Sequence, residues 1–239
     1  MQPDEMSHQA MGYDRTSIMF SPDGRLLQVE YAKKTVKQGT TAVGIVCRDG
    51  VVIVADKRVA EKLIVSDSIE KIYQVDDHIG ATASGILSDG RILIERAQVI
   101  AQQHRVTYNE PITTESLVKE ICDIKQLYTQ VGGARPFGVA IMFMGAGEKA
   151  HLFVTDPTGI FFEYKATAIG EAETEVKDVL LKQYKESINL EEGTKLAVSS
   201  LKKALGKDFD IDRIAGAYIK LEDRQFRRLT KEELVKFDK

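Results

Sequence analysis

The chain has 239 residues, 43% of them hydrophobic and 29% charged, which fits one large globular domain or two small ones. The net charge of −3, without a clustered basic face, argues against a nucleic-acid partner. There is no apolar run of about 18 residues and no apolar signal core at the N-terminus, so we expect a cytoplasmic protein with no membrane span.

The first 12 residues are polar and show no period, which predicts a mobile segment. A turn is expected next at Ser21-Pro22-Asp23-Gly24, because proline pre-sets φ at the second position of a type I turn and glycine suits the fourth. A helix over about 25–38 follows, with Gly39 as its C-cap. Its apolar residues recur at three- and four-residue steps: Leu26, Val29, Ala32 and Val36.

Short apolar and β-branched runs predict strands in the rest of the chain, at 40–47, 51–55, 71–75, 79–84, 137–144, 151–155, 160–164, 166–169 and 213–219. Asp49-Gly50 predicts a hairpin between the first two of them. Helical patterns predict two pairs of helices, at 85–106 with 113–130 and at 171–186 with 191–205. A last short helix begins at Thr230 with a capping box to Glu233.

Strand blocks therefore alternate with pairs of helices. This order favours an α/β fold with two stacked sheets covered by helices on both outer faces, a four-layer α/β/β/α sandwich. No linker interrupts the pattern after residue 12, so we expect a single domain over residues 13–239.

The cysteines Cys47 and Cys122 lie in apolar segments, which favours two buried thiols in a reducing compartment. The histidines have neither the i,i+4 spacing nor the accompanying CxxC pairs of a metal site; they are His8, His78, His104 and His151. No nucleotide-binding or GxSxG motif is present, so no metal and no cofactor is expected.

Gly39-Thr40-Thr41 stands directly before the first predicted strand, where an N-terminal-nucleophile hydrolase needs a threonine. Cleavage after the glycine would free the amine of Thr40, and that amine could act as the base for its own hydroxyl group. Asp56 and Lys71 lie at strand ends and could supply a carboxylate and an ammonium group. An active threonine peptidase is therefore one hypothesis.

The simpler interpretation assigns Thr40 and Thr41 to the strand and keeps Thr40 in an ordinary peptide bond. The 39 residues before it contain a defined turn and an amphipathic helix, unlike a leader that is discarded. On this interpretation the chain has no catalytic residue.

Nine segments, spread over almost the whole chain, resemble the α-type subunits of proteasomes, in particular those of the archaeal 20S core particle. They are Tyr13–Arg15, Phe20–Leu26, Gln28–Ala32, Gly39–Ile45, Ala55–Arg58, Ser68–Ile72, Thr129–Gly133, Arg135–Gly138 and Tyr164–Gly170. The resemblance implies an Ntn-hydrolase-like fold with an extra N-terminal helix. It also implies a non-catalytic subunit that forms a homo-heptamer on a ring of β-type subunits and admits unfolded proteins. A monomeric hydrolase of small amides is a third hypothesis.

The resemblance also implies roles for individual residues. Residues 1–12 would occlude the pore, and a cluster would hold the gate open, formed by Tyr13, Asp14, Arg15, Pro22 and Tyr31. A pocket would receive the C-terminal tail of an ATPase activator ring, with Lys71 binding the tail carboxylate beside Glu30, Lys33, Gly39 and Gly85. The narrow pore ring would be formed by Val131, Gly132 and Gly133.

Overall fold

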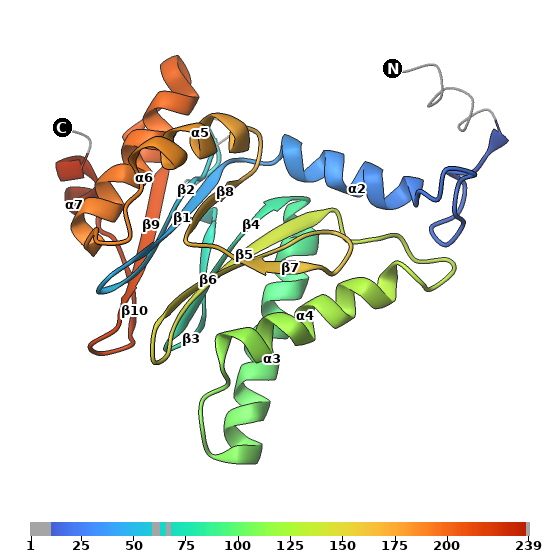
Figure 1. Cartoon of the computed structure of the whole chain (residues 1–239), viewed down its shortest axis with the longest axis horizontal. Helices are drawn as coiled ribbons and strands as arrows, with labels where there is room; N and C mark the ends of the chain where they lie inside the picture. Colours follow the sequence, from blue (N-terminus) through green and yellow to red (C-terminus); the bar gives the residue numbers. More distant parts are fainter. Residues whose placement is uncertain (1–10, 59–62, 66–67, 238–239) are drawn as a thin grey trace.

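The structure is a computed structural model that describes residues 11–58, 63–65 and 68–237 (Figure 1). Within these residues the strands form two five-stranded antiparallel sheets. The first has the order β10-β9-β2-β1-β8, with β1 at Ala42–Cys47, β2 at Gly50–Asp56, β8 at Ala166–Ile169, β9 at Ile214–Lys220 and β10 at Phe226–Arg228. The second has the order β3-β4-β5-β6-β7, with β3 at Ile72–Asp76, β4 at Ile79–Gly85, β5 at Val139–Ala146, β6 at Ala150–Thr155 and β7 at Phe161–Glu163.

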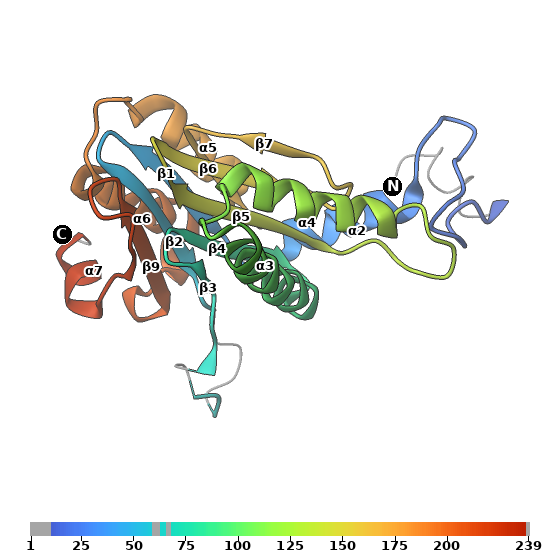
Figure 2. The ribbon, with the colours of Figure 1, turned by 90° about the horizontal axis from the view of Figure 1, so that it is seen from below.

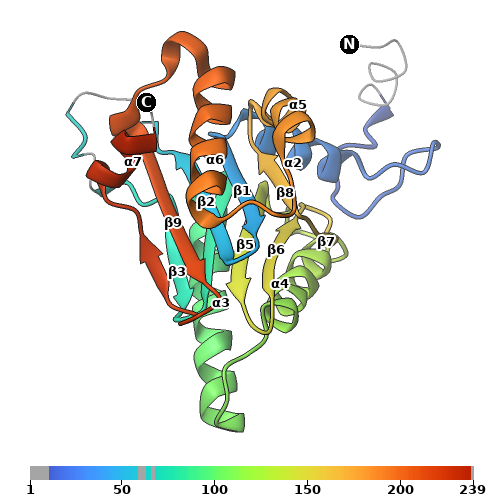
Figure 3. The same cartoon turned by 60° about the vertical axis from the view of Figure 1, so that its left-hand side comes forward.

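Helices cover both outer faces of the stacked sheets (Figure 2, Figure 3). The second sheet carries α3 (Leu87–Tyr108) and α4 (Thr114–Tyr128), and the first carries α5 (Glu173–Gln183) and α6 (Leu190–Leu205). The remaining helices are α2 (Leu27–Gln38), which packs on β4 and β5, α7 (Lys231–Phe237) beside α6, and the 3-10 turns Gly206–Asp208 and Ile211–Arg213. The predicted four-layer α/β/β/α sandwich is confirmed.

The strand β2 shows why the central strands have unbroken runs of apolar residues in the sequence. Val52 and Val54 point toward the core under α5 and α6, whereas Val51 and Ile53 point into the core between the two sheets. Successive side chains of a strand face opposite sides, so a strand between two covered faces is apolar at every position. All seven residues of β2 are accordingly buried.

Several predicted boundaries shift for local reasons. The helix predicted over 85–106 begins at Leu87, because Gly85 has a φ of +118° that a right-handed helix cannot contain. It continues to Tyr108 and ends at Asn109 in the left-handed conformation. The helix predicted over 171–186 is shorter, since Tyr184 is already extended. The last strand, β10, was not predicted.

Other local predictions are confirmed. Cys47 pairs with Gly50 across the predicted hairpin. The helix predicted over 113–130 is present, and the side chain of Thr113 caps it by accepting a hydrogen bond from the backbone N–H of Ser116. Both cysteines are buried, and burial raises the pKa of each thiol to about 12, which makes them unreactive. The predicted mobile segment 1–12 lies, except for its last two residues, outside the described residues.

Candidate functional site

Asp14 is held by two residues of α2. The backbone carbonyl of Asp14 accepts a hydrogen bond of 2.5 Å from Nε2 of Gln28, and the carboxylate accepts one of 3.4 Å from the hydroxyl group of Tyr31. Positions three apart on a helix share one face, so Gln28 and Tyr31 act on the same segment. The structure therefore joins two predicted gate residues. The sequence analysis missed Gln28, although its spacing from Tyr31 was the signal.

The other predicted gate residues flank Asp14 in the chain or lie in the turn before α2. Pro22 is exposed at the second position of the predicted turn, which is closed by a 2.8 Å hydrogen bond from the N–H of Gly24 to the carbonyl of Ser21. Tyr13 is half-buried beside Asp14, and Arg15 is exposed.

The predicted pore ring residues form an exposed loop between α4 and β5, at the same end of the molecule as the N-terminal segment (Figure 1, Figure 2). The hydroxyl group of Ser17 lies 3.5 Å from the carbonyl oxygen of Val131. A Cβ atom added to Gly132 would lie 3.6 Å from the side chain of Ile18. Gly133 has a φ of +86°, which favours glycine at the tip. The candidate pore loop is thus in contact with Ser17 and Ile18, which follow the predicted gate residues Tyr13, Asp14 and Arg15 in the chain.

Lys71 directly precedes β3 and is buried, with 4% of its surface exposed. Its Nζ donates a hydrogen bond of 2.5 Å to the carbonyl of Ala83 on β4. Burial lowers the pKa of Lys71 to about 8, although the nearby carboxylate of Asp56 opposes the shift. Lys71 lines a cavity of about 420 Å³ whose other charged lining residues are Lys57, Glu70 and Arg228. The cavity is mainly basic and suits an anionic group.

Gly39 and Gly85 contact each other where α2 ends against β4. A Cβ atom on Gly39 would lie 2.2 Å from the backbone nitrogen of Gly85, so no side chain fits there. Gly39 is the C-cap of α2, but its φ of −75° is ordinary, and the close approach is what requires glycine. The adjacent Ser84 donates its hydroxyl hydrogen to the carbonyl oxygens of Val36 or Thr40, at 3.2 and 3.0 Å.

The last two predicted pocket residues lie on α2 and form other ion pairs. Glu30 pairs with Arg25, whose hydrogen bond lowers the pKa of the Glu30 carboxylate. Lys33 lies 3.0 Å from a carboxylate oxygen of Asp156. In a single chain, therefore, neither residue lines the cavity of Lys71.

The residues of the peptidase hypothesis are engaged in other contacts. Asp56 is fully buried, and its two carboxylate oxygens accept hydrogen bonds from Nε and Nη2 of Arg213, at 3.1 and 2.7 Å. The N–H of Arg58 donates a further bond of 2.9 Å to Asp56. The Nζ of Lys71 faces Ala83, as described above. Sequence reasoning missed Arg213, because only the pairing of β9 with β2 places it beside Asp56.

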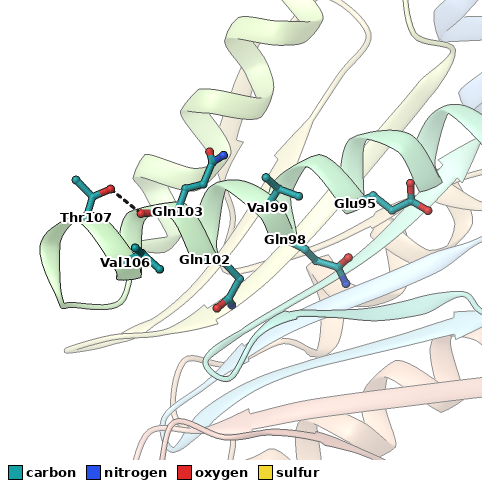
Figure 4. Close-up of a pocket in the computed structure, with 7 residues that line it drawn as sticks. All are labelled: Glu95, Gln98, Val99, Gln102, Gln103, Val106 and Thr107. Atoms are coloured by element: carbon teal, nitrogen blue, oxygen red, sulfur yellow. Dashed lines mark hydrogen bonds between the residues drawn. The ribbon is translucent and has the colours of Figure 1, made fainter.

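A groove along the exposed side of α3 has a volume of about 640 Å³ (Figure 4). Its lining holds one carboxylate, Glu95, together with glutamine, valine and threonine side chains, and no nucleophile paired with a base. Across the described residues, no cluster of three or more metal-ligating side chains is present. No described helix is long and apolar enough to span a membrane.

Comparisons with known proteins agree with this geometry. The proteasome subunit family matches residues 36–219, and the N-terminal signature of its A-type members matches residues 13–34. Three relatives are each described as the alpha subunit of a proteasome. That of Archaeoglobus fulgidus is 47% identical over 94% of this chain and 91% of its own length. That of Methanocaldococcus jannaschii is 49% identical over 94% and 86%. That of Methanosarcina thermophila is 50% identical over 94% and 91%. The chain therefore belongs to the proteasome subunit family, as a member of its α-type branch.

Proposed function

We propose that this chain is a non-catalytic subunit of the outer ring of a proteasome core particle. The observation that carries the proposal is that α2, upstream of Thr40, is an integral part of the fold. Leu27, Val29 and Val36 of this helix are buried, and Thr35 hydrogen-bonds the carbonyl of Gly138 at 2.8 Å. Removal of this helix to free an amine on Thr40 would expose the core, so the threonine stays in a peptide bond.

The proposed assembly is a homo-heptamer stacked on a ring of β-type subunits. A closed ring of identical chains needs two different complementary faces on each chain. Three consecutive apolar side chains near the N-terminal end support such a contact, because they are 43–63% exposed in a single chain: Ile18, Met19 and Phe20.

In the proposed ring, residues 1–12 restrict the entry of unfolded proteins. The contacts of Asp14 with Gln28 and Tyr31 support this role, because they fix the chain directly after the segment. Tyr13, Arg15 and Pro22 complete the cluster that we assign to the open gate, and Val131, Gly132 and Gly133 form the constriction below it.

We assign activator docking to the cavity of Lys71, whose ammonium group would bind the C-terminal carboxylate of an ATPase tail. Gly39 and Gly85 allow the close approach of two backbone segments beside this cavity. Glu30 and Lys33 would reach the same pocket from the other side of a ring interface. One charge-assisted hydrogen bond contributes about 1.5–3 kcal/mol, so a single tail binds weakly. Several tails on one ring raise the avidity through effective concentration.

Deletion of residues 2–12 tests the gate. We expect the assembled particle to hydrolyse an unstructured protein severalfold faster, while hydrolysis of a tripeptide changes little because a small substrate passes a closed gate. A matched variant replaces the same residues with a glycine-serine sequence of equal length. It distinguishes the effect of the segment's sequence on hydrolysis from the effect of its length. An unchanged rate for the unstructured protein would contradict the proposed gate.

A further inference from the structure

Gly138, directly before β5, is a junction of β5, α2 and α3. Its carbonyl accepts hydrogen bonds from the hydroxyl group of Thr35 on α2, at 2.8 Å, and from the N–H of Ile86 before α3, at 2.9 Å. Its own N–H donates to the carboxylate of Asp89 in the first turn of α3, at 2.9 Å. A Cβ atom on Gly138 would lie 2.7 Å from the side chains of Ile86 and Thr35, so any larger residue would displace both of them.

Asp89 is buried, with 7% of its surface exposed, and holds a second group at this junction. Arg135 donates two parallel hydrogen bonds to its carboxylate, of 2.6 and 2.7 Å, and a third of 3.0 Å to the carbonyl of Pro136. Burial alone would raise the pKa of Asp89, but the bonds from Arg135 and Gly138 outweigh it and lower the pKa. A bidentate pair between arginine and carboxylate fixes direction as well as distance.

The pair lies at one base of the exposed loop that carries Val131. The other base, the last turn of α4, is fixed by Lys125, whose Nζ donates to the carbonyl of Val139 at 2.9 Å and to the hydroxyl group of Thr155 at 3.0 Å. Both ends of the loop are therefore attached to the start of β5. Val131, Gly132 and Gly133, between these two attachments, are exposed.

This loop in turn lies against residues that follow the gate segment, with Ser17 at Val131 and Ile18 beside Gly132. A change in the direction of the loop would therefore move the surface against which Ser17 and Ile18 lie. Asp89 is the group best placed to set this direction, because it contacts both Arg135 and the fixed junction at Gly138.

We infer that Asp89 and Arg135 are positioning residues that set the loop Val131–Gly133 and, through its contacts with Ser17 and Ile18, the part of the chain from which residues 1–12 extend. The inference rests on the gate proposed above. It concerns residues that line neither the candidate pore nor the cavity of Lys71.

The test uses particles assembled with the β-type partner, carrying Asp89→Asn, Arg135→Met or Arg135→Lys in the full-length chain and in the chain lacking residues 2–12. We expect Asp89→Asn and Arg135→Met to change hydrolysis of an unstructured protein by about 2- to 30-fold in the full-length background only. Arg135→Lys, which keeps the charge but not the bidentate geometry, should give a smaller change. Arg91→Met removes an exposed arginine paired with Glu95 on the same helix and should have no effect.

Hydrogen–deuterium exchange of the peptide spanning residues 129–138 gives a second measurement that does not depend on the gate, in the particle or in the unassembled chain. Faster exchange in Asp89→Asn and Arg135→Met supports the positioning role, whereas unchanged exchange overturns it. Equal changes of hydrolysis with and without residues 2–12 also overturn it, because they indicate a general defect. If exchange accelerates but deletion of residues 2–12 itself has no effect, the proposed gate fails and the loop anchor stands.

Discussion

Among the described residues, Lys71 and Lys125 are the two buried lysines, and their ammonium groups differ in surroundings and in hydrogen-bond partners. Each has a pKa lowered to about 8 by loss of hydration. Lys125 is fully enclosed between α4 and the second sheet, where two neutral acceptors hold it. Lys71 lines a cavity and has one acceptor, Ala83, so an incoming carboxylate can take up its remaining donors.

Replacement of Lys71 with alanine should abolish stimulation by an ATPase activator. The loss should be about tenfold or more, because each tail loses a charge-assisted bond of about 1.5–3 kcal/mol. Stimulation of the unmodified particle should also fall as the pH rises from 7 to 9, since an ammonium group with a pKa of about 8 becomes neutral. Lys195→Ala, an exposed lysine on α6, is the control. Full stimulation of the Lys71→Ala particle, with intact rings, would exclude the pocket.

Lys125 gives a prediction for stability. Its folded pKa of about 8 lies below the ordinary value of 10.5, so the unfolded chain binds more protons between these values and stability rises with pH. Between pH 8 and 9 this residue should add about 1 kcal/mol to the free energy of unfolding. The two thiols, whose pKa is raised from 9.0 to about 12, oppose this rise from about pH 8 upward, and they do so equally in every lysine variant.

Lys125→Met should remove that increment, as measured by urea unfolding at pH 8 and 9. Lys119→Met, on the exposed side of the same helix, should keep it. An equal rise in both variants would mean that Lys125 does not titrate in this range.

At the scale of elements, the amphipathic pattern of α2 predicted the helix but not its partners. Its apolar residues identified a buried side, and Gly39 was expected as its cap. The structure adds the reason for the glycine, which is the contact with Gly85 rather than a positive φ. The boundary of α3 depends on the second of these glycines, since Gly85 leaves the strand with a φ of +118°.

Gly39→Ala should therefore lower the free energy of unfolding by about 1–3 kcal/mol, the usual effect of forcing an extra carbon into a packed core. The added Cβ would meet backbone atoms of Gly85, which cannot rotate away. Gly147→Ala, in a turn where no atom lies within 4 Å of the new Cβ, should change stability by less than about 0.5 kcal/mol. Chemical denaturation of both variants measures the difference, and equal stabilities would show that the junction relaxes.

In the whole molecule, the packing of the N-terminal helix on the stacked sheets bears on whether Thr40 could act as a catalytic nucleophile. The packing of α2 on β4 and β5 argues against removal of the residues before Thr40, which a free threonine amine would require. In addition, Arg213 occupies the carboxylate of Asp56. Both features favour a structural role for this chain over a proteolytic one.

The intact mass of the chain within the assembled particle should retain residues 13–39, and Thr40→Ala should leave peptide hydrolysis unchanged. The catalytic threonine of the β-type partner, replaced in a parallel particle, serves as the positive control. A chain that begins at Thr40, or a loss of hydrolysis in the Thr40→Ala particle, would favour the peptidase instead.

The amino-acid pattern was enough to predict the helices and most of the strands, though not β10, together with their order, the layered fold class and the family resemblance. These depend on local periodicity, on turn residues such as Pro22 and Gly50, and on short motifs. Tertiary structure alone decided that Arg213 neutralises Asp56 across 157 positions, and that Asp89 joins Arg135 to Gly138 across 46 and 49. Such pairs depend on the register of sheets and the packing of helices, which bring distant residues together without leaving a local pattern.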